Sequence, residues 1–252
     1  MNEKLAVTVF TVREQLKTVG IGPVFKELAQ MGYKGLQLSG LPAGYDQDEV
    51  AYHLKANNVV AAGMHVPFAR LTNELDLVLK EAKKYGTNAL FCPYLPEELR
   101  TVEGYRAVKE GLNKVAQQAP DFQIGFHNHA FEFETTIDGQ DALSYLLEPS
   151  QDNRILAEID VYWVKKGGRD PYTFIQTYSG RMPMIHLKDM TKDEEETFAE
   201  VGEGSIPFLP ILQWGEQNGV EWYVVEQDVC KRDPMDSLRI SLANLQQLAT
   251  QL

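Results

Sequence analysis

The sequence contains few cysteines, comparatively few basic residues and no long hydrophobic run. Its 252 residues include two cysteines, Cys92 and Cys230, too few for a disulfide framework, so we expect a reducing compartment. The 36 acidic side chains outnumber the 24 basic ones and give a formal net charge of −12. We expect no nucleic-acid partner, because phosphate binding requires clustered Lys and Arg. We also expect no membrane span, which needs roughly 20 consecutive apolar residues.

The N-terminal residues lack the pattern of a secretory signal. A short apolar stretch ends at Arg13 and Glu14, and no small-residue cleavage site follows. Apolar residues make up 44% of the chain and charged residues 24%, which is ordinary for a globular protein and too apolar for a disordered one. We therefore expect a cytoplasmic globular protein.

Short β-rich runs alternate with longer helical segments along the whole chain. The runs lie at residues 5–10, 36–39, 59–64, 89–91, 123–126, 155–159, 184–187 and 222–225. Helical patterns follow at residues 22–33, 46–57, 72–85, 102–119, 141–147, 171–178, 207–218 and 235–249. This alternation predicts an α/β protein with one domain, a (β/α)₈ TIM barrel over residues 1–252. A doubly wound open sheet is disfavoured, because no Gly-rich turn follows the first run.

Polar residues gather at the carboxyl ends of the predicted strands, where barrels of this kind form their active sites. Ordered by strand, they are His65; His127, Asn128, His129 and Glu132; Glu158 and Asp160; His186, Lys188 and Asp189; and Glu226 and Asp228. This set holds four of the five histidines. Residues two apart on a strand point to the same side, so several of these side chains converge. Imidazoles with carboxylates favour a divalent transition metal, namely manganese, iron, cobalt or zinc.

Individually, these residues also have structural explanations. A lone strand-end histidine is more often hydrogen-bonded than ligating, Asp160 suits a cap, and Glu226 suits a surface position. Trp163 fits the wall of a sugar site and ordinary packing equally well. Independent caps do not explain a histidine and several carboxylates at consecutive strand ends, so the metal site is the favoured interpretation.

At these residues the chain resembles the sugar phosphate isomerase/epimerase family with a xylose isomerase-like TIM barrel. The matching stretches are GFHNHAFEF at 125–133, EIDVYW at 158–163, GGRDP at 167–171, RMPMIHLKD at 181–189, VGEG at 201–204 and VEQD at 225–228. The resemblance spans nearly the whole chain. The ordered set is specific for the superfamily but not for one reaction.

The resemblance implies one divalent metal held by a carboxylate after the fifth strand and by Asp160, His186 and Glu226. Where many epimerases have the fifth-strand Glu, this sequence has His127, and Glu132 lies five residues further on. Either Glu132 folds back to the metal, which we favour, or His127 is the ligand.

The resemblance further implies a metal-dependent isomerase or epimerase that moves a proton on a keto-sugar or polyol through an enediolate. The expected catalytic residues are Glu226, His127, His129 and Lys188. The expected substrate-binding residues are His65, Trp163, Glu158 and Lys188, with Glu158 alternatively orienting a ligand. A phosphorylated substrate is not supported, because there is no Gly-rich phosphate loop.

Three alternatives remain at this stage. The first is a metal-dependent dehydratase or lyase acting on a cyclic polyol or keto-sugar. The second is a catalytically silent sugar-binding barrel, which the missing fifth-strand Glu leaves open. The third, an endonuclease of the same superfamily, conflicts with the acidic net charge. Barrels of this type often form dimers or tetramers, so a homo-oligomer is also considered, although the sequence reveals no interface.

Overall fold

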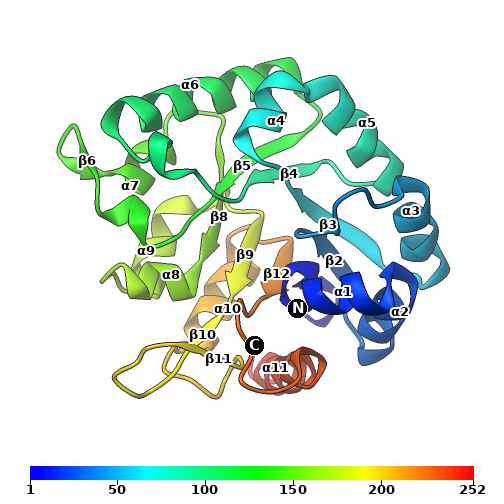
Figure 1. Cartoon of the computed structure of the whole chain (residues 1–252). Coiled ribbons are helices and arrows are strands. Elements are labelled where there is room, and N and C mark those ends of the chain that lie inside the picture. Colours follow the sequence, from blue (N-terminus) through cyan, green and yellow to red (C-terminus); the bar gives the residue numbers. More distant parts are fainter.

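The computed structural model describes residues 1–252 and contains eight parallel strands closed into a barrel (Figure 1). The strands are β1 (Leu5–Thr8), β2 (Gly35–Leu38), β3 (Val60–His65), β4 (Ala89–Cys92), β5 (Gln123–His127), β8 (Leu156–Asp160), β9 (Met184–Leu187) and β12 (Trp222–Val225). Each strand pairs with the next along the chain, and β1 pairs with β12 to close the ring. The predicted (β/α)₈ barrel is confirmed.

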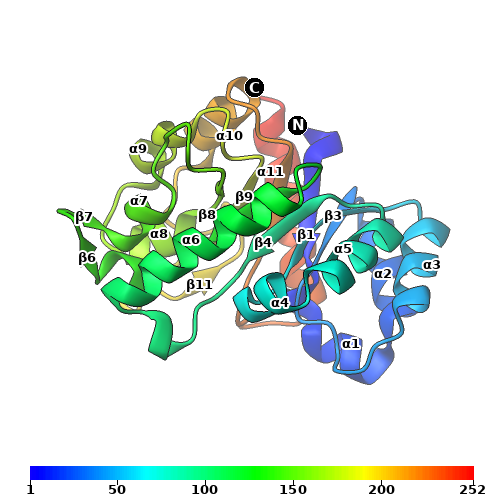
Figure 2. The same cartoon turned by 90° about the horizontal axis from the view of Figure 1, so that it is seen from above.

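Helices form an outer ring around the strands and follow chain order (Figure 1). They are α1 (Arg13–Val19), α2 (Ile21–Met31), α3 (Gln47–Ala56), α4 (Phe68–Asn73), α5 (Leu75–Tyr85), α6 (Val102–Gln118), α7 (Ala142–Leu146), α8 (Val161–Lys166), α9 (Pro171–Ile175), α10 (Phe208–Gln217) and α11 (Pro234–Ala249). In the perpendicular view the first and last segments lie side by side, as closure between β1 and β12 requires (Figure 2). None of these helices combines the length and the apolar character that a bilayer crossing would need.

Short elements complete the connections. The 3₁₀ turns are η1 (Asn2–Lys4), η2 (Val9–Val12), η3 (Glu97–Leu99), η4 (Phe131–Phe133) and η5 (Gln176–Tyr178). Two small hairpins pair β6 (Thr136–Ile137) with β7 (Gln140–Asp141) and β10 (Asp189–Met190) with β11 (Phe198–Ala199). Several of these elements follow barrel strands, so they shape the mouth of the barrel.

Burial and capping explain the regular elements. Helix α6, for example, buries Val108, Leu112 and Val115 on one face, and Thr101 caps its first turn by accepting the N–H of Gly104. A core of 61 buried residues joins helices to strands, and a separate cluster of six fills the barrel interior. Met184 belongs to that interior cluster, and the Gln37 amide lies 3.2 Å from its sulfur. A buried polar layer therefore rests on the apolar floor of the barrel.

The structure departs from the predicted elements at three places. Strand β1 ends at Thr8, whose hydroxyl accepts the N–H of Phe10, so residues 9–12 form η2 and not a continued strand. The predicted helix 72–85 is divided at Glu74, whose backbone is not helical. Helix α8 was not predicted; it starts directly after Asp160, whose carboxylate accepts the N–H groups of Tyr162 and Trp163.

Candidate active site

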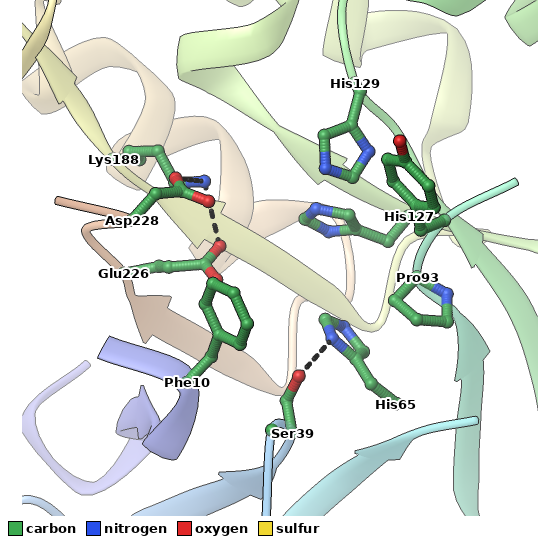
Figure 3. Close-up of a pocket in the computed structure, with 11 residues that line it drawn as sticks. Phe10, Ser39, His65, Pro93, His127, His129, Lys188, Glu226 and Asp228 are labelled. Carbon is green, nitrogen blue, oxygen red and sulfur yellow. Dashed lines mark hydrogen bonds and ion pairs between the residues drawn. The ribbon is translucent and has the colours of Figure 1, made fainter. Parts of the chain in front are cut away.

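A pocket of about 230 Å³ opens at the C-terminal mouth of the barrel (Figure 3). Its polar lining consists of Ser39, His65, His127, His129, Lys188, Glu226 and Asp228. Its remaining lining consists of Phe10, Gly40, Pro93 and Tyr94. These residues lie at or just beyond the ends of every barrel strand except β8. The pocket is therefore at the end of the barrel where this fold places catalysis.

Four buried side chains at this mouth bring possible metal-ligand atoms together. His127, Asp160, His186 and Glu226 come from the neighbouring strands β5, β8, β9 and β12, and one atom of each lies within 4.8 Å of the others. His186 Nδ1 is 2.8 Å from Glu226 Oε2, and His127 Nε2 is 4.0 Å from Asp160 Oδ2. We call these four residues the upper cluster. It contains three of the four metal ligands expected from the sequence.

Glu132, the fourth expected ligand, lies outside the upper cluster. The η4 turn folds its side chain back onto its own loop, where Glu132 Oε2 accepts the backbone N–H of His129 at 2.7 Å. Its side chain is fully buried, and burial raises the pKa of Glu132 to about 8. The preference for Glu132 over His127 stays a prediction, but the geometry favours the alternative, because His127 joins the grouped ligand atoms and Glu132 does not.

Lys188 lies between three carboxylates. Its Nζ is 2.9 Å from Asp160 Oδ2, 3.0 Å from Glu226 Oε2 and 2.6 Å from Asp228 Oδ2. Burial lowers the pKa of Lys188, but these carboxylates outweigh that effect and raise it above its usual value. Lys188 is therefore an ammonium at neutral pH, and its charge is already paired.

Glu158 forms the centre of a second group beneath the first. His65 Nε2 is 2.6 Å from Glu158 Oε2, His127 Nδ1 is 3.4 Å from the same oxygen, and His186 Nε2 is 3.6 Å from Oε1. These four residues also satisfy the spacing of a metal site. Burial raises the pKa of Glu158, but His65 and His186 outweigh it and hold that pKa well below its usual range. Glu158 does not line the pocket, so the expected substrate contact is replaced by contacts to the imidazoles.

Trp163 is displaced from its expected place at the pocket wall. Its ring packs against His129, with centroids 5.2 Å apart, and it is absent from the lining. Phe10 and Tyr94 are the aromatic side chains that line the pocket. Sequence reasoning missed both, together with Ser39; their one available signal was their position just after predicted strands. Asp228 was placed at a strand end but was given no role.

Figure 3 shows the pocket side chains approaching from two directions. Lys188, Asp228 and Glu226 extend from one side, whereas His127 and His129 extend from the other. Burial lowers the pKa of His129 well below its usual value and that of His127 to about 3. At neutral pH, uncharged imidazoles thus face a carboxylate and an ammonium across the pocket.

The charges of the buried residues fit a divalent cation. Three carboxylates, those of Asp160, Glu226 and Asp228, contact the one ammonium, and a fourth, that of Glu158, contacts only imidazoles and an amide. Burial lowers the pKa of His186, but Glu158 and Glu226 raise it to about 10. Without a metal, the ring is therefore an imidazolium with a proton on each nitrogen. His127 Nδ1 is buried and makes no hydrogen bond, although Glu158 Oε2 lies 3.4 Å away. Imidazole and carboxylate together suit a transition metal, and a dication would supply the missing positive charge.

Comparison with known proteins finds relatives named inosose dehydratase. The one from Clostridium beijerinckii is 25% identical over 155 residues, which cover 53% of this chain and 51% of that protein. The chain thus spans about half the length of the first curated relatives it matches. The one from Geobacillus kaustophilus is 24% identical over 251 residues, covering 81% of this chain and 79% of that protein.

Solved structures and a family model extend the comparison. A sugar phosphate isomerase/epimerase from Parabacteroides distasonis superposes with a TM-score of 0.80 at 18% identity, covering 96% of this chain and 97% of that one. This likeness concerns the fold. The family model described as xylose isomerase-like TIM barrel matches residues 25–248, and the chain therefore belongs to the xylose isomerase-like TIM barrel family.

Proposed function

We propose that this protein is an isomerase or epimerase that moves a proton at the carbon next to the carbonyl of a keto-sugar or oxidised polyol. The observation that carries the proposal is the pocket in which neutral His129 faces Glu226 and Lys188, directly beside the upper cluster. An acceptor and a donor of protons on opposite sides of one cavity suit chemistry in which a proton leaves and returns.

The pocket favours a neutral substrate of monosaccharide size. Its volume is about 230 Å³, and its lining includes the carboxylates of Glu226 and Asp228. Lys188 is the one Lys or Arg in the lining, and three carboxylates already pair its charge. A phosphate would meet repulsion there and gain no free cation. Phe10 and Tyr94 offer apolar surfaces to the C–H face of a ring.

His127, Asp160, His186 and Glu226 would hold the metal. When bound, a divalent metal polarises a carbonyl oxygen and stabilises the charge that develops on it. Manganese, iron, cobalt and zinc all suit this ligand set, so each of these metals should be tested alongside metal-free protein.

The acid and base roles follow from the protonation states. Neutral His129 accepts the proton from the carbon next to the carbonyl, and the electron pair of that C–H bond moves to the carbonyl oxygen to form an enediolate. A proton delivered by water to the opposite face of the carbon, with His129 releasing its own proton to solvent, gives the epimer. Delivery of the His129 proton to the former carbonyl carbon gives the isomer. Lys188, an ammonium with a raised pKa, would donate a hydrogen bond to the oxygen that becomes negative once that oxygen replaces one of the three carboxylates at its Nζ.

Dehydration is the second candidate, because relatives from three genera carry the name inosose dehydratase. The first step is the same. The enediolate then expels the hydroxyl group on the next carbon, which leaves as water after taking the proton that His129 accepted in the first step. The two reactions therefore differ only after the first proton transfer.

Proton exchange with solvent tests both candidates. The purified protein, with each of the four metals and after chelation, is incubated in D₂O with inososes and other neutral keto-sugars and followed by NMR. Deuterium at the carbon next to the carbonyl with an epimer or isomer supports the proposal, and deuterium with loss of water supports dehydration. Binding without exchange would contradict both and favour the silent barrel.

A further inference from the structure

Gln37 is a buried amide in the middle of the barrel whose role the proposed function leaves open. It lies on β2, with no exposed surface, and reaches across the interior to residues of β8 and β9. The register between β2 and β3 shifts at Gln37, which pairs with Gly63. Such irregularities re-aim side chains.

The contacts of Gln37 determine which of its atoms donates. Gln37 Nε2 is 2.5 Å from Glu158 Oε1, and Gln37 Oε1 is 2.7 Å from His186 Nε2. A carboxylate accepts hydrogen bonds only, so the Gln37 atom facing Glu158 is the NH₂ group. The amide oxygen therefore faces His186, and a carbonyl oxygen also accepts only. The hydrogen of this second bond must come from His186 Nε2.

This hydrogen bond decides which nitrogen of His186 keeps its proton. Gln37 Oε1 holds a proton on Nε2, while Nδ1 faces Glu226 Oε2 at 2.8 Å. Nδ1 is then the nitrogen that loses its proton when a cation is bound on the side of Asp160 and Glu226. Partners that fix the tautomer of a ligating imidazole in this way strengthen metal binding.

We propose that Gln37 is a positioning residue that holds a proton on His186 Nε2 and thereby presents Nδ1 to the upper cluster. The proposal rests on the proposed function only in naming a metal as the occupant; the proton on Nε2 does not require one. Glu158 anchors the amide from the other side, so a carboxamide is the one natural side-chain group of this length that satisfies both neighbours.

The first test locates the proton in metal-free protein. Long-range ¹H–¹⁵N NMR of the histidine rings, with His186→Gln to assign the signal, is expected to show a slowly exchanging proton on Nε2. Gln37→Met removes the acceptor, so this slow exchange should be lost. Gln37→Glu restores an acceptor for His186 while opposing Glu158, so the proton should persist if that variant folds. Retention of the protected proton in Gln37→Met, or its absence in the wild type, overturns the proposal.

The second test measures the consequence for cation binding. Titration of Co²⁺ into chelator-treated protein should give a Kd raised 10–100-fold by Gln37→Met, with a changed visible spectrum. The matched control is Gln123→Met at the opposite end of the barrel, where the side chain bonds only Glu221, and its Kd should not change. An unchanged Kd and spectrum in Gln37→Met contradict the proposal. If wild-type protein has the Nε2 proton but binds no Co²⁺, the metal assignment fails and the role of Gln37 stands.

Discussion

The Lys188 ammonium lies 2.6 Å from Asp228 Oδ2, and two further carboxylates contact the same nitrogen. One buried cation thus holds side chains from the ends of β8, β9 and β12 together. Only Asp228 among the three carboxylates has substantial exposure, at 24% of its side chain. The arrangement closes one side of the pocket without contributing a free positive charge.

Replacing Lys188 by Met should destabilise the metal-free protein strongly. Removing one partner of a buried ion pair leaves uncompensated charge, and the usual cost is about 3–5 kcal/mol. Urea unfolding of chelator-treated protein measures the change. Lys84→Met breaks the exposed pair with Asp48 and should cost less than about 1 kcal/mol. Equal effects of the two substitutions would contradict the stabilising role of Lys188.

Substitutions in the upper cluster and at Glu132 should show whether Glu132 is a metal ligand. His186→Ala and Asp160→Asn are expected to abolish metal retention in elemental analysis, because both residues belong to the upper cluster. Glu132→Gln is expected to retain full metal content, because Glu132 bonds its own loop. Loss of metal from Glu132→Gln would restore the original sequence-based assignment.

The buried carboxyl group of Glu132 should make stability depend on pH. Burial raises its pKa from 4.5 to about 8, so the folded state binds this proton more tightly than the unfolded state. The stabilisation is complete below about pH 4.5 and is lost as the pH rises toward 8. In Glu132→Gln that loss should disappear, a difference of a few kcal/mol between pH 5 and pH 9 in urea unfolding, on the order of 1.36 kcal/mol per pKa unit. Parallel pH profiles for the two proteins would refute it.

Asp189 should be needed for the loop that follows β11. Its carboxylate accepts the backbone N–H groups of Met190, Gly202, Gly204 and Ile206. Asp189→Asn replaces one acceptor oxygen by a donor, so some of these N–H groups lose their partner at a cost of roughly 1–3 kcal/mol. The melting temperature should fall accordingly, whereas Asp193→Asn on the exposed hairpin should change it little. Similar melting temperatures for both variants would contradict the prediction.

The barrel was predictable because its signals are local and repeat along the chain. Alternating apolar runs and caps such as Asp170 ahead of Pro171 mark individual elements, and eight repetitions leave few topologies. Because His186, Asp160 and Glu226 follow consecutive predicted strands, their proximity could be predicted before any distance was known. Their convergence is a property of the fold, so residue order alone was enough.

The remaining details depend on turns that the residue pattern does not encode. Whether Glu132 or His127 approaches the cluster depends on the η4 turn, and Phe10 reaches the pocket because η2 interrupts the first strand. Gln37 escaped notice because a single amide inside an apolar strand gives no sign that it crosses the barrel. These residues act through geometry over long sequence separations, which a pattern of neighbours cannot show.

The two carboxylate oxygens of Asp160 have different partners, one in the backbone and one in the upper cluster. Its Oδ1 accepts the first N–H groups of α8, while Oδ2 faces Lys188. A related protein that had lost its activity would still need Asp, Asn, Ser or Thr at this position to cap the helix. The side chain of Glu226 caps no helix, so in inactive relatives the residue at position 226 should change before the residue at position 160.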